Sequence, residues 1–220
     1  MSKKVAVILS GCGVFDGSEI YESVITLLSL DKAGAQVQCF APNIQQMHVI
    51  NHLTGEVTEG ESRNVLVEAA RLVRGEIKDL SEARVEDFDA VILPGGFGAA
   101  KNLCDFAIKG SELTVNDDLA GFVRGMHQAK KPVGLMCIAP VMVGKLFGEG
   151  AHFTIGQDLE AAAAIEATGA VHEPCPVNNI CIDGTNNLVT TPAYMLAGSI
   201  SEAASGIEKL AGAVLDQVAE

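Results

Sequence analysis

Cys137 is the residue in this sequence whose surroundings most clearly predict chemistry. The apolar segment 133–136 before it is typical of a buried strand, and Pro140 behind it is typical of the first turn of a helix. A residue at such a strand-to-helix turn lies exposed at the sheet edge, where the helix N-terminus favours a thiolate over a thiol. The pattern predicts a nucleophilic cysteine; the alternative is a buried structural cysteine.

A glycine-rich segment, PGGFG at 94–98, follows another predicted strand. Glycines allow backbone N–H groups to approach a bound group closely, as a site for an oxyanion requires. The alternative interpretation is a strand-to-helix turn that needs positive φ angles. A second segment, SGCG at 10–13, lacks the G-x-G-x-x-G spacing, so the sequence does not predict a dinucleotide site.

The spacing of the histidines selects none of them as a catalytic base or a metal ligand. His48 and His52 are four residues apart, as in a zinc-binding helix, but the residues between them supply no general base. The segment that carries them is also poorly helical. The remaining histidines are scattered along the chain: His127, His152 and His172. We therefore expect neither a metal nor any other cofactor.

Predicted strands and helices alternate along the chain, and their order positions these segments. Strands are expected at 4–9, 37–40, 89–93, 131–136, 153–155, 180–183 and 188–191. Helices are expected at 19–32, 61–74, 99–106, 117–129, 140–147, 159–167 and from 200 onward. This order predicts a mostly parallel sheet with helices on both faces, in which ligands bind outside the carboxyl ends of the strands. Three loops leave at that edge: 10–18, 94–98 and 137–140.

The helix expected at 19–32 carries an apolar stripe. Ile20, Val24, Leu27 and Leu28 fall on one face, which we expect to pack on the sheet, and Gly34 ends the helix. The segment 43–60 that comes later is polar and is expected to be irregular.

Composition limits the class of protein. The chain of 220 residues is expected to form one α/β domain, with a net charge of −13 and no Lys/Arg stripe, so we expect no nucleic-acid partner. No segment approaches the ~20 apolar residues of a membrane span, and the apolar run at 5–9 is too short for a signal peptide. Its six cysteines lack C-x-x-C spacing and are expected to be free thiols, which favours the cytosol.

Four segments together resemble the ElbB/ES1 family: SGCGVFDGSE at 10–19, PGGFGAAKNL at 94–103, MCIAP at 136–140 and TTPAYM at 190–195. This family is the amidotransferase-like, isoprenoid biosynthesis branch of the PfpI/ThiJ superfamily, and the resemblance covers nearly the whole chain. It implies a single domain over 1–220 with a flavodoxin-like three-layer sandwich, as in class I glutamine amidotransferases. It also implies that Cys137 is the nucleophile of the elbow.

The resemblance further implies a carboxylate partner for the sulfur from the first helix. Counting back from the turn at 33–34 places Glu22 at that position, with Glu19 as the alternative. Periodicity alone would not select Glu22, because it lies off the apolar stripe. A solvated glutamate in the first turn, where acid suits the helix dipole, is the other interpretation.

One departure from the superfamily bears on the reaction. Many members carry a histidine directly after the cysteine, whereas this chain has Ile138. This disfavours acyl transfer by a triad and leaves a Cys–Glu pair, which suits small carbonyl compounds. The resemblance implies a cofactor-independent glyoxalase that converts glyoxal or methylglyoxal to glycolate or lactate without glutathione.

In the predicted reaction, the Cys137 thiolate adds to the aldehyde and forms a hemithioacetal. Gly95, Gly96 and the N–H of Ile138 are expected to hold its oxyanion, and Glu22 to move a proton between adjacent carbons. A redox sensor with an oxidisable cysteine and a partner-binding protein linked to isoprenoid metabolism are the alternatives. The assembly is expected to be a homodimer.

Overall fold

A computed structural model describes residues 2–219, without the side chain of residue 160. Its central sheet has seven strands in the order β10-β11-β7-β6-β1-β2-β5, and all neighbours are parallel except β10 and β11. The strands are β1 Lys4–Ile8, β2 Gln36–Ala41, β5 Ile77–Asp79, β6 Ala90–Leu93, β7 Val133–Met136, β10 Cys181–Asp183 and β11 Leu188–Thr191. The predicted mostly parallel α/β sheet is confirmed.

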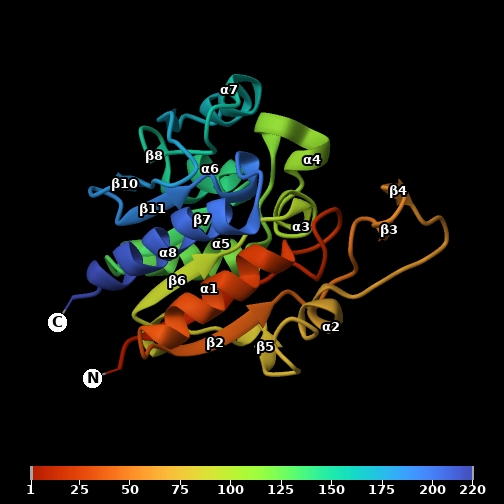
Figure 1. The fold of residues 1–220 in the computed structure, drawn as a ribbon, viewed down its shortest axis with the longest axis horizontal. Helices are drawn as coiled ribbons and strands as arrows, with labels where there is room; N and C mark the ends of the chain where they lie inside the picture. The colour runs from red at the N-terminus through yellow and green to blue at the C-terminus, as the bar shows by residue number, and fades with distance from the viewer. Residues whose placement is uncertain (1, 220) are drawn as a thin grey trace.

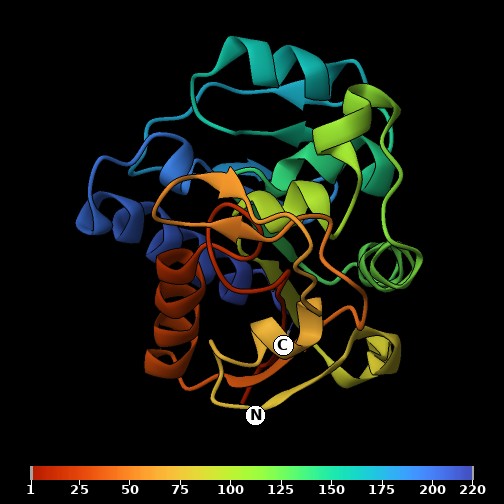
Figure 2. The same cartoon turned by 90° about the vertical axis from the view of Figure 1, so that its right-hand side faces the viewer.

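Helices cover both faces of this sheet, which makes three layers (Figures 1 and 2). On one face α1 (Ile20–Lys32) and α8 (Ile200–Asp216) lie side by side, and the other face carries α5 (Asp117–Gln128) and α6 (Val143–Phe147), with α7 (Leu159–Glu166) packed against α6 farther from the sheet. The alternation of side chains along the strands divides the core accordingly. In β1, Val5 and Val7 pack with α1 and α8, whereas Ala6 and Ile8 pack with α5.

Shorter elements complete the described chain. The helices are α2 Val65–Ala69, α3 Phe97–Lys101 and α4 Phe106–Lys109, with 3-10 turns at Leu80–Glu82, Val85–Asp87, Gly110–Glu112, Ala139–Met142 and Ala193–Met195. Two small sheets pair β3 (Ile50–Asn51) with β4 (Glu56–Val57) and β8 (His152–Phe153) with β9 (Val171–His172). No helix within residues 2–219 has both the length and the apolar character that crossing a membrane requires.

Several predicted elements are wrong in extent. The helix expected at 61–74 is only α2: Asn64 caps its start, and after Ala69 the chain continues in turns up to Arg74 and Gly75, which take positive φ angles. The helix expected at 99–106 is two short helices, α3 and α4. The strand expected at 153–155 belongs to the small β8–β9 sheet, and the irregular segment 43–60 contains the β3–β4 hairpin.

The buried face of α1 is the largest error. Ile20, Val24 and Leu28, expected to pack on the sheet, are between 41% and 46% exposed, and Leu27 is half-buried. The residues that face inward are Glu22, Ser23, Ile25, Thr26 and Leu30. Periodicity locates an apolar stripe but does not say which side of the helix meets the sheet, and here polar side chains with buried partners take that side.

Candidate active site

Four loops meet at the carboxyl edge of the sheet, one more than the sequence predicted. The loops that follow β1, β6 and β7 are those expected, and the fourth follows β11 at 192–196. The first turn of α1 begins at the end of the loop after β1, so it lies at the same edge. Side chains and backbone groups from all these segments converge around Cys137.

Cys137 occupies a tight turn between β7 and the 3-10 turn Ala139–Met142, as predicted. Its φ angle is +59°, and its N–H donates to the carbonyl of Thr191 over 3.1 Å. A positive φ is costly for a residue with a Cβ, and the turn imposes it at the position that a nucleophile elbow uses. The side chain is not open at the edge as expected, because the residue is only 7% exposed.

Glu22 lies against the thiol and is fully buried. Its Oε2 accepts the N–H of Gly95 over 2.8 Å, its Oε1 accepts the N–H of Tyr194 over 3.1 Å, and its carboxyl group is hydrogen-bonded to the Cys137 side chain. The first turn of α1 is fixed by Glu19, whose Oε2 accepts the N–H of Glu22 over 2.6 Å. The structure therefore brings Glu22, and not Glu19, to the sulfur.

Burial sets the ionisation of Glu22. The pKa of the carboxyl group is raised to about 7: burial is the largest cause and the charge of Glu19 adds to it, while the N–H groups of Tyr194 and Gly95 and the thiol of Cys137 act in the opposite direction. The main cause of the raised pKa is therefore the loss of water around the carboxyl group. A carboxyl group of this pKa exchanges a proton near neutral pH.

The Cys137 thiol keeps its proton more strongly than expected. Burial first, and then the charge of Glu22, raise its pKa well above the ordinary value, although the N–H groups of Gly96 and Ile138 act in the opposite direction. The prediction of a resting thiolate is therefore wrong. The following helical segment is short, and its dipole does not outweigh burial beside a carboxylate. At neutral pH, Glu22 ionises first and the sulfur is a thiol.

The predicted oxyanion residues divide into two groups. The N–H groups of Gly96 and Ile138 lie close enough to the sulfur to lower its pKa, and they can reach an oxygen attached to a carbon on it. The N–H of Gly95 is already bonded to Glu22, so Gly95 positions the carboxylate instead. A Cβ on Gly95 would lie 2.4 Å from the Cβ of Cys137, which is why a glycine is required there.

The loop after β1 holds the glycine segment in place. The side-chain amide of Asn102 donates to the carbonyls of Ser10 and Asp16, each over 2.9 Å. Gly96, at φ +91°, lies so close to this loop that a Cβ would meet the backbone N of Glu19 at 2.3 Å. The loop therefore acts as a brace behind the Gly96 N–H and contributes no dinucleotide fingerprint.

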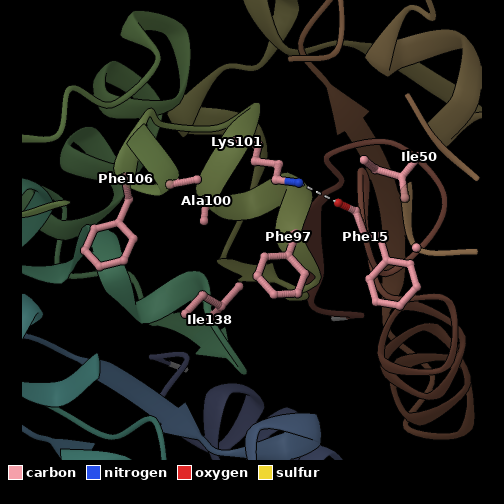
Figure 3. A pocket seen from close by; sticks show the side chains of 9 residues that line it. Phe15, Ile50, Phe97, Ala100, Lys101, Phe106 and Ile138 are labelled. Atoms are coloured by element: carbon pink, nitrogen blue, oxygen red, sulfur yellow. Dashed lines mark hydrogen bonds between the residues drawn. The ribbon is translucent and has the colours of Figure 1, made fainter. Parts of the chain in front are cut away.

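A cavity of about 510 Å³ opens beside the elbow (Figure 3). Its walls are largely apolar and come from the loop after β1, the β3–β4 hairpin, α3, α4 and the elbow, chiefly through Phe15, Ile50, Phe97, Lys101, Phe106 and Ile138. No local sequence pattern predicts this cavity, because its aromatic residues come from separate segments.

Histidine takes no part in the described site. Within residues 2–219, the hydrogen bonds and ion pairs of the histidine rings go to other groups, such as Asp16 and Phe15 for His52 and Glu173 for His152. No cluster of three or more histidine, cysteine or acidic side chains suited to a metal occurs in this described range. The six cysteines are free thiols.

Sequence reasoning missed Tyr194, whose N–H reaches Glu22 because Ala193 has a φ of +44°.

Comparisons with known proteins agree with this architecture. Residues 3–191 match the DJ-1/PfpI family. A structure described as an isoprenoid biosynthesis protein with an amidotransferase-like domain, from Ehrlichia chaffeensis, superposes with a TM-score of 0.93 at 36% identity, over 99% of this chain and all of that one. The resemblance to the ElbB/ES1 family is thereby confirmed.

Two curated relatives extend the similarity. The human glutamine amidotransferase-like class 1 domain-containing protein 3, mitochondrial, is 45% identical over 97% of this chain and 82% of its own length. The rat ES1 protein homolog, mitochondrial, is 44% identical over 97% of this chain and 83% of its own length. Both names place these relatives in mitochondria, which contradicts the prediction of a cytosolic protein. Free thiols and a short apolar N-terminal run do not distinguish these two compartments.

Proposed function

The chain belongs to the DJ-1/PfpI family, and from this premise we propose that it is a cofactor-independent glyoxalase that converts glyoxal and methylglyoxal to glycolate and lactate. The observation that carries the proposal is the buried pair of Cys137 and Glu22. A thiol on the elbow contacts a carboxyl group whose pKa is about 7, and the backbone N–H groups of Gly96 and Ile138 lie near the same sulfur.

The first step joins sulfur to the aldehyde carbon. Because the resting sulfur is a thiol, the Glu22 carboxylate accepts its proton as the S–C bond forms. The aldehyde oxygen becomes an oxyanion, which the N–H groups of Gly96 and Ile138 stabilise until the Glu22 carboxyl group returns the proton to it. The product is a neutral hemithioacetal, and Glu22 is a carboxylate again.

The second step is an isomerisation without an external oxidant. The Glu22 carboxylate removes a proton from the carbon that is bonded to the sulfur and delivers it to the neighbouring carbonyl carbon. The proton of the hemithioacetal hydroxyl group moves to the oxygen of that carbonyl. The hemithioacetal thereby becomes a 2-hydroxyacyl thioester of Cys137. Water then attacks the thioester carbon, the S–C bond breaks, and the sulfur takes a proton. The sum is one aldehyde and one water per hydroxy acid.

A redox sensor is supported less well than this enzyme. Oxidation of a cysteine requires an accessible thiolate, whereas Cys137 is nearly buried and its pKa is raised. No contact of the described residues favours a role restricted to partner binding in isoprenoid metabolism.

The test is turnover by purified protein that has been treated with a chelator and freed of glutathione. We expect glyoxal to be converted to glycolate, and Cys137→Ala to show no conversion because no covalent hemithioacetal can form. Cys137→Ser should be nearly inactive, since a hydroxyl is much harder to ionise. If the wild type shows no turnover above Cys137→Ala but gains oxygen mass at Cys137 under mild peroxide, the sensor replaces the enzyme.

We also propose that the chain forms a homodimer through the outer face of α1. The support is an exposed apolar stripe on that helix, made of Ile20, Tyr21, Val24 and Leu28. A contiguous exposed apolar stripe of this kind marks association surfaces, and one face that meets its own copy gives a two-fold dimer. Light scattering on the purified protein should give twice the 22.9 kDa of one chain.

A further inference from the structure

The cavity beside the elbow has no use in the turnover of glyoxal, which has no substituent to fill it. We propose that this cavity binds the uncharged apolar substituent of a 2-oxoaldehyde larger than methylglyoxal, such as an aryl or branched alkyl group. This inference rests on the proposed aldehyde chemistry at Cys137, and it names the substrate class that the site selects.

The cavity lies next to the groups that would hold the reacting carbonyl. Ile138 lines the cavity, and its own N–H lies near the sulfur. Phe97 also lines the cavity, and it directly follows Gly96, whose N–H is the second one near the sulfur. Cys137 itself lies behind this wall. Ile138 belongs to both places, so we infer that a substrate held at its N–H extends its carbon chain toward the cavity, past Ile138 and Phe97.

The chemistry of the walls fits an uncharged substituent. Lys101 is the one charged side chain among the described lining residues, and its Nζ already donates to the carbonyl of Phe15 over 2.9 Å. The same Nζ lies 5.5 Å from the centre of the Phe97 ring. The ammonium group thus ties together two aromatic residues of the wall. The other lining residues are apolar, so an uncharged apolar substituent loses little hydration on entering, whereas a cationic or strongly hydrated one would lose water without gaining a partner among these side chains.

Hydrogen bonds hold in place the part of the cavity wall that Phe15 and Ile50 form. The N–H of Phe15 donates to Nε2 of His52 over 3.2 Å, and their rings are 5.1 Å apart. Ile50 N–H donates to Asp16 Oδ2 over 2.7 Å, so the β3–β4 hairpin is attached to the loop after β1 (Figure 2). The cavity is therefore formed before a substrate arrives, as ligand sites generally are.

The size of the cavity exceeds what small aldehydes need. Ligand sites measure about 300–1,000 Å³, and an apolar cavity of about 150 Å³ already holds benzene. At about 510 Å³, the cavity admits a phenyl group with room for further carbons. Phenylglyoxal is therefore a suitable probe, and methylglyoxal and glyoxal are its smaller comparators.

The test fills the cavity from an exposed position. Ala107 on α4 lines it, and Ala107→Trp places a large ring at its opening without disturbing the buried core. Ile108 is the next residue on the same helix, is 67% exposed and does not line the cavity, so Ile108→Trp is the matched control. Circular dichroism and urea unfolding confirm that both variants fold.

We expect Ala107→Trp to lower kcat/KM for phenylglyoxal about tenfold or more, mainly through KM, because even single methylene groups in apolar pockets change selectivity ~10–200-fold. Turnover of glyoxal should stay within about twofold, and Ile108→Trp should change neither substrate. Equal effects of Ala107→Trp on both aldehydes, or no effect on either, would overturn the proposed substrate class.

A binding measurement separates this inference from the proposed reaction. Acetophenone carries the phenyl ketone but no aldehyde, so it can occupy the cavity without reacting. If no aldehyde is turned over, saturable binding of acetophenone to the wild type and to Ile108→Trp, with loss in Ala107→Trp, would keep the apolar site while the reaction is rejected. Absence of saturable binding to the wild type would overturn the site.

Discussion

The two faces of helix α1 contrast with each other more than any other pair of surfaces in the molecule. The inner face carries Glu22, Ser23 and Thr26, which are completely buried, whereas the outer face exposes Ile20, Val24 and Leu28. Hydrophobic burial alone would place these faces the other way round. The inner polar groups are nevertheless all bonded. Ser23 donates to the carbonyl of Glu19 over 2.7 Å, and Thr26 lies 3.8 Å from the sulfur of Met136.

This difference shows which contacts set the orientation of α1 on the sheet. Buried polar groups cost little when every one has a partner, so the inner face can carry the chemistry of the site while Ile25 and Leu30 supply its apolar contacts. The outer face needs no partner within the chain. The helix is therefore oriented by its bonds to the elbow, and the apolar stripe is left available for another surface.

Removal of the inner carboxylate should have the largest effect. Glu22→Gln keeps the shape of the side chain but cannot accept the thiol proton, so we expect aldehyde turnover to fall by about 10²–10⁴-fold. The matched control is Asp31→Asn, the same change at an exposed position of the same helix. Steady-state rates with methylglyoxal compare the two. Turnover in Glu22→Gln close to that of Asp31→Asn would remove Glu22 from the mechanism.

Replacement of a leucine by alanine should destabilise the protein much more on the inner face of α1 than on its outer face. Leu30 is completely buried and Leu28 is 45% exposed, two residues apart on one helix. We expect Leu30→Ala to lower the free energy of unfolding by about 2–4 kcal/mol, because it leaves a cavity, and Leu28→Ala by less than about 1 kcal/mol. Urea unfolding at two protein concentrations separates the stability of the chain from that of any assembly. Equal losses would contradict the observed orientation of α1.

The ionisation of Glu22 should make stability depend on pH. Its pKa is about 7 in the folded chain and near 4.5 when unfolded, so between these values the folded state binds more protons. The stabilisation is complete below about pH 4.5 and is lost as pH rises through 7, an effect on the order of 3 kcal/mol. The difference in unfolding free energy between wild type and Glu22→Gln should therefore fall from pH 5 to pH 8.

Turnover should change in the opposite direction over the same range. The carboxylate form of Glu22 is the base, so kcat should rise with pH through about 7. Asp31→Asn should retain both trends. A difference in stability that is flat with pH would show that Glu22 is ionised in the folded protein well below neutral pH.

Much of this fold was predictable from local patterns, but the site was predictable only in part. The strands and the elbow at Cys137 follow from short apolar runs and from Pro140, which act within a few residues of one another. The resemblance selected Glu22, which periodicity had placed off the stripe. Its raised pKa, the bond from Gly95 and the N–H of Tyr194 depend on segments far apart in the chain. No local pattern reports such contacts.

A charge on the outer face of α1 should have the smallest effect on the turnover of the single chain. Leu28→Glu places a carboxylate within the exposed stripe, where it contacts water in the monomer but another apolar surface in the proposed dimer. Turnover should stay within about twofold, since surface changes away from a site alter free energies by ~0.5 kcal/mol or less. Light scattering should show the mass falling from twice 22.9 kDa to 22.9 kDa. Leu28→Ala, which adds no charge, should weaken the dimer less. A wild type that remains at 22.9 kDa at high concentration would reject the dimer, and the orientation of α1 would then rest on its inner bonds alone.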